Sequence, residues 1–177
     1  MQYSEVRGDL KTGDIVAIDT RNILTRSVQA IFGSPMYAMY THIGILIWRG
    51  DHLHIVEMDG RYNIERPLSQ YANAGKEILV FRLSELDTAK ISRSIDLHMR
   101  DEIKYDYGSF FSIGARLAFG VGIMDNPKKL VCTDFVLNIL KEAGIDILKD
   151  QIILGNKYLM TPAELCWYLG QSLLRIN

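Results

Sequence analysis

The sequence predicts an α+β domain, with strands in the first half of the chain and helices mostly in the second. Short apolar runs, rich in β-branched residues and bounded by turn residues, predict the strands. These runs lie at residues 15–18, 40–48, 52–58, 62–66 and 78–83. Apolar residues at helical spacing predict the later helices. With 177 residues, 48% of them hydrophobic, the chain can bury one sizeable core, and we expect a single domain over residues 1–177.

Turn residues separate the predicted strands. Lys11-Thr12-Gly13-Asp14 precedes the first strand, and residues 20–33 then change to a helical period that ends at Gly33-Ser34-Pro35. Arg49-Gly50-Asp51 predicts a hairpin turn, and Asp59-Gly60 predicts a second tight turn. The second and third strands are therefore expected to pair antiparallel.

Capping residues and apolar periodicity predict three later helices. Asp87 is a suitable N-cap for a helix that continues to about Ile103. The next helix carries Cys132 at its start and reaches Gly144, a suitable C-cap. The last helix opens at Thr161-Pro162-Ala163-Glu164, which combines an N-cap, a proline at the first helical position and a capping-box glutamate.

The most apolar stretch covers residues 108–124 and is expected to form a buried or pocket-lining helix. It contains Arg116 and is short for a membrane span, so membrane or lipid contact is the less favoured alternative. The amino terminus lacks the order of basic, apolar and small residues that marks a secretory signal. We therefore expect a cytoplasmic protein.

Charge and composition limit the expected partners. A net charge of -1 with interspersed signs argues against nucleic acid. Cys132 and Cys166 lie in unlike contexts and do not suggest a disulfide framework, which favours a reducing compartment. The sequence shows no cluster that resembles zinc or calcium ligands, and no cofactor is expected.

Cys132 lies at the start of a helix, where a thiol is well placed to act as a nucleophile. The attacking form is the thiolate, which a helix amino terminus and a neighbouring imidazolium stabilise. The amides around Cys132 and Thr133 would donate to a bound carbonyl as part of an oxyanion hole. Asp134 opposes thiolate formation unless its side chain faces away or binds the substrate. A free cysteine is also a common packing residue, which is the role expected for Cys166.

His42 lies on an apolar strand and is either a hydrogen-bonded core residue or a general base. A base works best when its second ring nitrogen donates to a fixed acceptor. The partner strand offers Glu57 and His54, which strand alternation places on opposite faces. Glu57 is favoured because a carboxylate both orients an imidazole and stabilises imidazolium. The register of the hairpin, which decides between them, stays open at this point.

Six segments in a fixed order give the chain a family resemblance that covers most of its length. They are Gly13-Asp14-Ile15-Val16, Tyr40-Thr41-His42-Ile43-Gly44-Ile45, Val56-Glu57-Met58, Lys104-Tyr105-Asp106-Tyr107, Val131-Cys132-Thr133-Asp134 and Thr161-Pro162-Ala163-Glu164-Leu165. The chain resembles the circularly permuted papain-like cysteine hydrolases, in the YiiX/YebB-like branch of the NlpC/P60 superfamily. In that branch the histidine strand precedes the cysteine helix. Many members have Cys-Ser-Glu where this chain has Cys132-Thr133-Asp134.

The resemblance implies a small antiparallel sheet packed against helices, with Cys132 as nucleophile, His42 as base and Glu57 as the orienting residue. Substrate contacts are expected from Thr133 and Asp134. Two further residues that precede the cysteine helix, Tyr105 and Tyr107, are expected to line the pocket, with an aromatic core as the alternative role.

The expected substrate is a small peptide or an acylated amino acid, because relatives in the superfamily cleave peptide bonds of cell-wall peptides. The implied reaction is amide hydrolysis through an acyl-enzyme. Two alternatives stay open. One is a lipid acyltransferase or thioesterase of the lecithin:retinol acyltransferase type, which the apolar stretch from Tyr105 to Met124 favours. The other is a non-catalytic binding module on the same fold.

Overall fold

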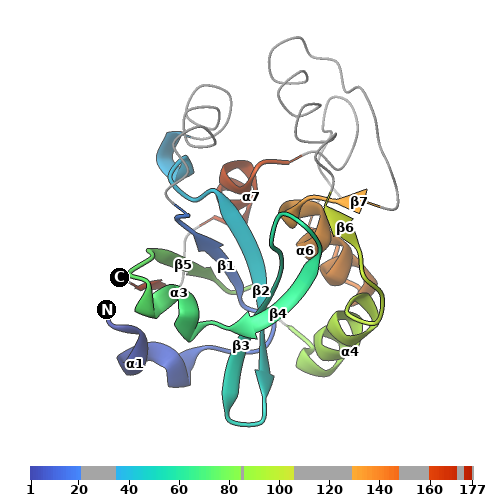
Figure 1. Cartoon of the computed structure of the whole chain (residues 1–177), viewed down its shortest axis with the longest axis horizontal. Coiled ribbons are helices and arrows are strands. Elements are labelled where there is room, and N and C mark those ends of the chain that lie inside the picture. The colour runs from blue at the N-terminus through green and yellow to red at the C-terminus, as the bar shows by residue number, and fades with distance from the viewer. Residues whose placement is uncertain (21–34, 85, 106–128, 148–159, 171–173, 177) are drawn as a thin grey trace.

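A six-stranded antiparallel sheet forms the centre of the protein (Figure 1). The structure is a computed structural model, and it describes residues 1–20, 35–84, 86–105, 129–147, 160–170 and 174–176. The strand order is β4-β3-β2-β1-β5-β8. These strands are β1 (Ile15–Ile18), β2 (His42–Arg49), β3 (His52–Met58), β4 (Asn63–Pro67), β5 (Ile78–Phe81) and β8 (Leu174–Ile176). A separate parallel pair consists of β6 (Lys104–Tyr105) and β7 (Lys129–Leu130).

Helices cover both faces of this sheet, which confirms the α+β class. The helical elements are α1 (Tyr3–Val6), η1 (Arg7–Asp9), η2 (Pro35–Tyr37), α3 (Ser69–Asn73), α4 (Thr88–His98), α6 (Cys132–Glu142) and α7 (Pro162–Leu169). Figure 1 shows α4, α6 and α7 on one side of the sheet and α1 and α3 on the other. In the part of the chain that the structure describes, none of the helices is both long and apolar enough to cross a membrane.

Alternation along β2 divides the buried interior into two cores. Ile43, Ile45 and Ile47 pack with the apolar faces of α4, α6 and α7. Leu46 points the other way and packs with residues from α1 and the segment around α3. Because successive side chains of a strand point to opposite faces, one apolar strand serves both layers.

Most predicted strands agree with the structure to within a few residues. The bounds of β1 and β3 are those predicted, whereas β2 begins at His42 rather than at residue 40 and β5 ends at Phe81 rather than at residue 83. The hairpin turn contains Gly50 at a positive φ of 57°, as such turns require. The helices expected at residues 20–33 and 108–124 lie outside the described residues.

The helix that follows Asp87 is shorter than predicted, because it ends at His98 and not near Ile103. Its cap is as expected, since the Asp87 carboxylate accepts from the amides of Ala89 and Lys90. At the other end, the Asn63 side chain donates to the carbonyl oxygens of His98 and Asp101 at 2.8 and 3.0 Å. This contact from β4 satisfies carbonyls that the helix leaves unpaired and turns the chain away.

The start of β1 is held by a buried ion pair. The Asp14 carboxylate is fully buried and accepts from Nε and Nη2 of Arg82, each at 2.7 Å. It also accepts from the Lys11 amide at 2.7 Å. Since Arg82 directly follows β5, this bidentate pair joins the beginning of β1 to the end of its neighbour.

Gly44 is a position of close approach within the sheet. It lies opposite Glu57 in the pairing of β2 with β3. A Cβ on Gly44 would lie 2.5 Å from both Cγ1 and Cδ1 of Ile55 and 3.1 Å from the Val56 carbonyl oxygen. Ile55 is fully buried, so its side chain has little room to move.

Replacing Gly44 by alanine is therefore expected to destabilise the protein by about 1–3 kcal/mol, the usual cost of overpacking a core. Urea unfolding of Gly44→Ala against the unchanged protein measures this cost. Gly8→Ala is the matched control, because nothing lies within 4 Å of the Cβ that it would add. Equal unfolding midpoints for the two variants would contradict the close approach.

Candidate active site

Cys132 is the first residue of α6. The helix begins there because Val131 has extended backbone, with φ -91° and ψ 168°, while its carbonyl accepts the first helical bond from the Phe135 amide at 3.0 Å. The cysteine side chain is 5% exposed. The first amides of a helix have no partner within it, so Cys132 lies beside donors that point out of the helix end.

His42 is the first residue of β2 and pairs with Ile18 of β1. Its side chain is 12% exposed. Nε2 of the ring lies 2.8 Å from Oε2 of Glu57. The register explains this contact, because Glu57 lies opposite Gly44 and is thus the diagonal neighbour of His42 on the same face.

Glu57 is fully buried, and both of its carboxylate oxygens have partners. Oε2 faces His42. Oε1 accepts from the Tyr71 hydroxyl at 2.8 Å and lies 2.7 Å from Nε of Arg66. The arginine contact is an ion pair rather than an aligned hydrogen bond, because the Nε–H direction does not point at the oxygen.

The imidazole of His42 is electrostatically coupled to both neighbours. Burial lowers its pKa, but the interactions with Cys132 and with Glu57 outweigh burial and raise the pKa to about 10. The ring is therefore cationic at neutral pH. Since Nε2 faces Glu57, Nδ1 is the ring nitrogen left for the thiol. The contact is made where both elements begin, at the first residue of β2 and the first residue of α6.

The structure thus brings together Cys132, His42 and Glu57. It does not bring His54 to the imidazole, because Nδ1 of His54 lies 2.8 Å from Oε1 of Glu65, on the neighbouring strand β4. In this register Glu57 contacts the imidazole of His42, and His54 contacts Glu65 instead.

The other predicted site residues have different surroundings. The Thr133 side chain is fully buried, and its hydroxyl donates to the Met160 carbonyl at 2.6 Å, a contact that joins α6 to the start of α7. Asp134 is buried in the first turn of α6. Tyr105 lies in β6, next to β7, and Tyr107 lies outside the described residues.

The second cysteine has the packing environment that was expected for it. Cys166 lies within α7 and is fully buried, and burial raises the pKa of its thiol. A thiol in such surroundings is a poor nucleophile. The structure therefore distinguishes the two cysteines by environment as well as by position.

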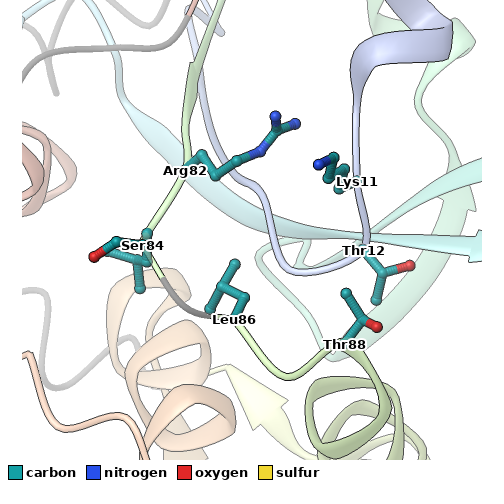
Figure 2. A pocket seen from close by; sticks show the side chains of 7 residues that line it. Lys11, Thr12, Arg82, Ser84, Leu86 and Thr88 are labelled. Atoms are coloured by element: carbon teal, nitrogen blue, oxygen red, sulfur yellow. The ribbon is translucent and has the colours of Figure 1, made fainter.

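A cavity of about 590 Å³ lies away from these residues (Figure 2). It is lined by Lys11, Thr12, Arg82, Leu83, Ser84, Leu86 and Thr88. Thr12 precedes β1 and Arg82 follows β5, so the cavity lies near the beginning of β1. His42 pairs with Ile18 at the other end of that strand. The cavity is therefore separate from the Cys132 environment.

Two of the residues around Glu57 escaped prediction from the sequence. Arg66 was treated as part of a strand, and Tyr71 lies in the five-residue helix α3, which is too short to give a periodic signal. The register of β3 with β4 would have placed Arg66 near Glu57. Ile64 lies opposite Glu57, and Arg66 is two residues further along β4, on the same face. No local feature identifies Tyr71.

Known proteins resemble this chain in both sequence and structure. The sequence model of the permuted papain-like amidase enzymes, YaeF/YiiX, C92 family, matches residues 9–167. The crystal structure of the metalloprotein YiiX from Escherichia coli O157:H7 is similar to this chain, with a TM-score of 0.56 and 21% sequence identity. The match covers 77% of this chain and 68% of that one, and at this identity it shows a shared fold. A search of curated proteins finds no match.

Glu57→Gln is expected to lower the pKa of His42 by about 1–3 units, because it removes a negative charge that lies 2.8 Å from the ring. NMR titration of labelled histidines measures this shift. His98, whose Nδ1 lies 3.0 Å from the Ser94 carbonyl oxygen, is an internal reference outside the site. An unchanged titration midpoint for His42 would show that Glu57 does not act on the ring.

Protonation of His42 makes the stability of the protein depend on pH. The folded-state pKa of His42, about 10, lies above the unfolded value of about 6.5, so the imidazolium stabilises the fold fully below pH 6.5. This contribution is lost as the pH rises through about 10. The difference in free energy of unfolding between the unchanged protein and Glu57→Gln should therefore be largest at pH 6.5 or below and smallest near pH 10.

Proposed function

The chain belongs to the permuted papain-like amidases of the YaeF/YiiX, C92 family, and we propose that it cleaves an amide through Cys132, His42 and Glu57. The expected resemblance to the YiiX branch is confirmed, under the C92 family name rather than that of NlpC/P60. As a member of this family the protein is a papain-like cysteine hydrolase. The observation that carries the proposed triad is the coupling of His42 to the thiol at the start of α6 and to the buried Glu57.

The proposed reaction begins from an ion pair, in which the cationic His42 ring lies beside the Cys132 thiolate. The thiolate sulfur then attacks the amide carbonyl carbon, and the carbonyl π electrons move to its oxygen. When the tetrahedral intermediate collapses, the C–N bond breaks and the imidazolium donates its proton to the leaving amine. The enzyme retains a thioester on Cys132.

Hydrolysis of the thioester completes the cycle. Neutral His42 takes a proton from water, whose oxygen attacks the thioester carbonyl carbon. The C–S bond then breaks, the carboxylic acid leaves, and the sulfur and the ring return to their starting protonation states. In both halves the oxyanion is placed to accept from amides at the start of α6. Removal of one such donor costs about 3 kcal/mol in related mechanisms.

Glu57 orients His42 in this proposal. Its contact at Nε2 leaves Nδ1 directed to the reaction, and its charge stabilises the imidazolium that forms. A carboxylate gives a stronger hold than a neutral amide would, because the hydrogen bond is charge-assisted.

The structurally similar protein YiiX is described as a metalloprotein. Within the described ranges of this chain, no three His, Cys, Asp or Glu side chains lie close enough together to hold a metal ion. The described part of this chain therefore offers no ligand set for a metal ion. The proposed mechanism uses side chains and backbone amides throughout.

Thiol labelling tests whether Cys132 is an activated nucleophile. Near neutral pH, iodoacetamide should alkylate Cys132 much faster than Cys166, and His42→Ala should slow the reaction at Cys132 by at least about tenfold. Peptide mass spectrometry resolves the two sites. His54→Ala is the matched control, because this histidine of the same hairpin contacts Glu65 instead of the site. Equal labelling of both cysteines, without dependence on His42, would refute the enzyme proposal and favour a binding module.

The substrate class is tested by parallel incubation with cell-wall muropeptides, acylated amino acids and phospholipids. We propose an amide of a small peptide or an acylated amino acid, so the expected result is a released amine and an acyl adduct on Cys132. Both products should be absent in Cys132→Ala and present in Cys166→Ala. Adducts from phospholipid alone would instead support lipid acyl transfer, the alternative suggested by residues 105–124, most of which lie outside the described residues.

A further inference from the structure

The Glu57 carboxylate raises a problem that its contact with His42 does not solve. Moving a charged carboxylate from water into a protein interior costs several kcal/mol unless a counter-charge and hydrogen bonds compensate. Glu57 is fully buried and pairs with the ring through Oε2. Oε1 therefore needs its own donors, at every stage of a reaction in which His42 gains and loses a proton.

Two side chains next to Glu57 compensate this oxygen, one as a hydrogen-bond donor and one as a counter-charge. The Tyr71 hydroxyl of α3 donates to Oε1 at 2.8 Å, and Nε of Arg66 in β4 lies 2.7 Å from the same oxygen. The Arg66 guanidinium lies over the Tyr71 ring, 5.7 Å from its centroid, and Nη2 of Arg66 lies 3.5 Å from Oδ2 of Asp59. Arginine and tyrosine thus fix each other as well as the carboxylate.

We propose that Arg66 and Tyr71 are positioning residues, which hold Glu57 against His42, Arg66 through its positive charge and Tyr71 through its hydrogen bond. This inference rests on the proposed function of Cys132, His42 and Glu57. Burial and the Glu57 charge raise the pKa of Tyr71, so its hydroxyl stays protonated and remains a donor at every pH of interest.

The arrangement places charges of alternating sign in a row. Arg66 is positive, Glu57 negative, the His42 imidazolium positive and the Cys132 thiolate negative. The active ion pair therefore forms in a group of four charges whose sum is zero. Without Arg66 the same group would carry a net negative charge in a partly desolvated environment, and each proton of the His42–Cys132 pair would be harder to remove.

The charged and titratable groups that face this row come from several elements. They are His42 of β2, Arg66 of β4, Tyr71 of α3, Cys132 of α6 and, against the arginine, Asp59 after β3. Among the described side chains that contact Glu57, Arg66 is the group whose positive charge stays constant through the reaction. It is therefore the group whose removal changes the electrostatics most directly.

The test is the pH profile of Cys132 alkylation by iodoacetamide, which needs no substrate. Arg66→Met should shift this profile to higher pH by about one unit, the effect of removing one nearby positive charge. Arg66→Lys should restore most of the wild-type profile, because it keeps the charge. Tyr71→Phe should shift the profile in the same direction by a smaller amount.

Arg49→Met is the matched control. Arg49 also forms an ion pair with a glutamate of β4, since its Nη2 lies 2.9 Å from Oε2 of Glu65, but it does not contact Glu57. The Arg49→Met variant should change the stability of the protein without moving the pH profile of Cys132 alkylation. A merely structural role of Arg66 would give the same result as Arg49→Met.

An unchanged profile in folded Arg66→Met, or a shift to lower pH, would overturn the proposal. If Arg66→Met does not fold, Tyr71→Phe decides, since an unchanged profile there would equally overturn it. Failure of the proposed function gives a different result, because the wild-type profile would then be independent of His42. The positioning role and the catalytic role are thus tested separately.

Discussion

The buried carboxylate of Glu57 is the group on which the arrangement of the site depends. A charge with no exposed surface is stable only if every oxygen has a partner, and here the partners come from β2, β4 and α3. The buried carboxylate therefore requires three features at once: the register of the β2–β3 hairpin, the pairing of β4 with β3, and the docking of α3. An error in any of them would leave a charge unpaired in the interior.

The features that the sequence predicted well are those with local causes. The strand at residues 52–58 is bounded by turn residues on both sides, and it has the predicted bounds. Asp87 and Thr161 cap their helices through their own side chains, and the Thr161 capping box with Glu164 is complete. The Cys132 helix was instead predicted from apolar periodicity and the C-cap Gly144, since its N-cap Val131 makes no side-chain cap hydrogen bond.

The features that the sequence did not predict depend on contacts between distant parts of the chain. Glu57 was favoured as the partner of His42 for its chemistry, but the hairpin register stayed open. In that register Gly44 leaves space for Ile55, and no local pattern reports that space. The early end of α4 is imposed by Asn63, 35 residues away from the carbonyl it binds. The strand β8 has three residues and is stabilised by pairing with β5, so its own sequence is too short to be recognised.

The position of the reacting groups within their elements has a dynamic consequence. His42 and Cys132 are each the first residue of an element, and the ends of helices and strands open locally at free energies well below that of global unfolding. Glu57 is paired on both sides, to Gly44 and to Ile64, and belongs to the more protected part of the sheet. The nucleophile and the base can therefore adjust to an incoming carbonyl by small segmental motions, while the carboxylate provides a rigid reference point for the ring.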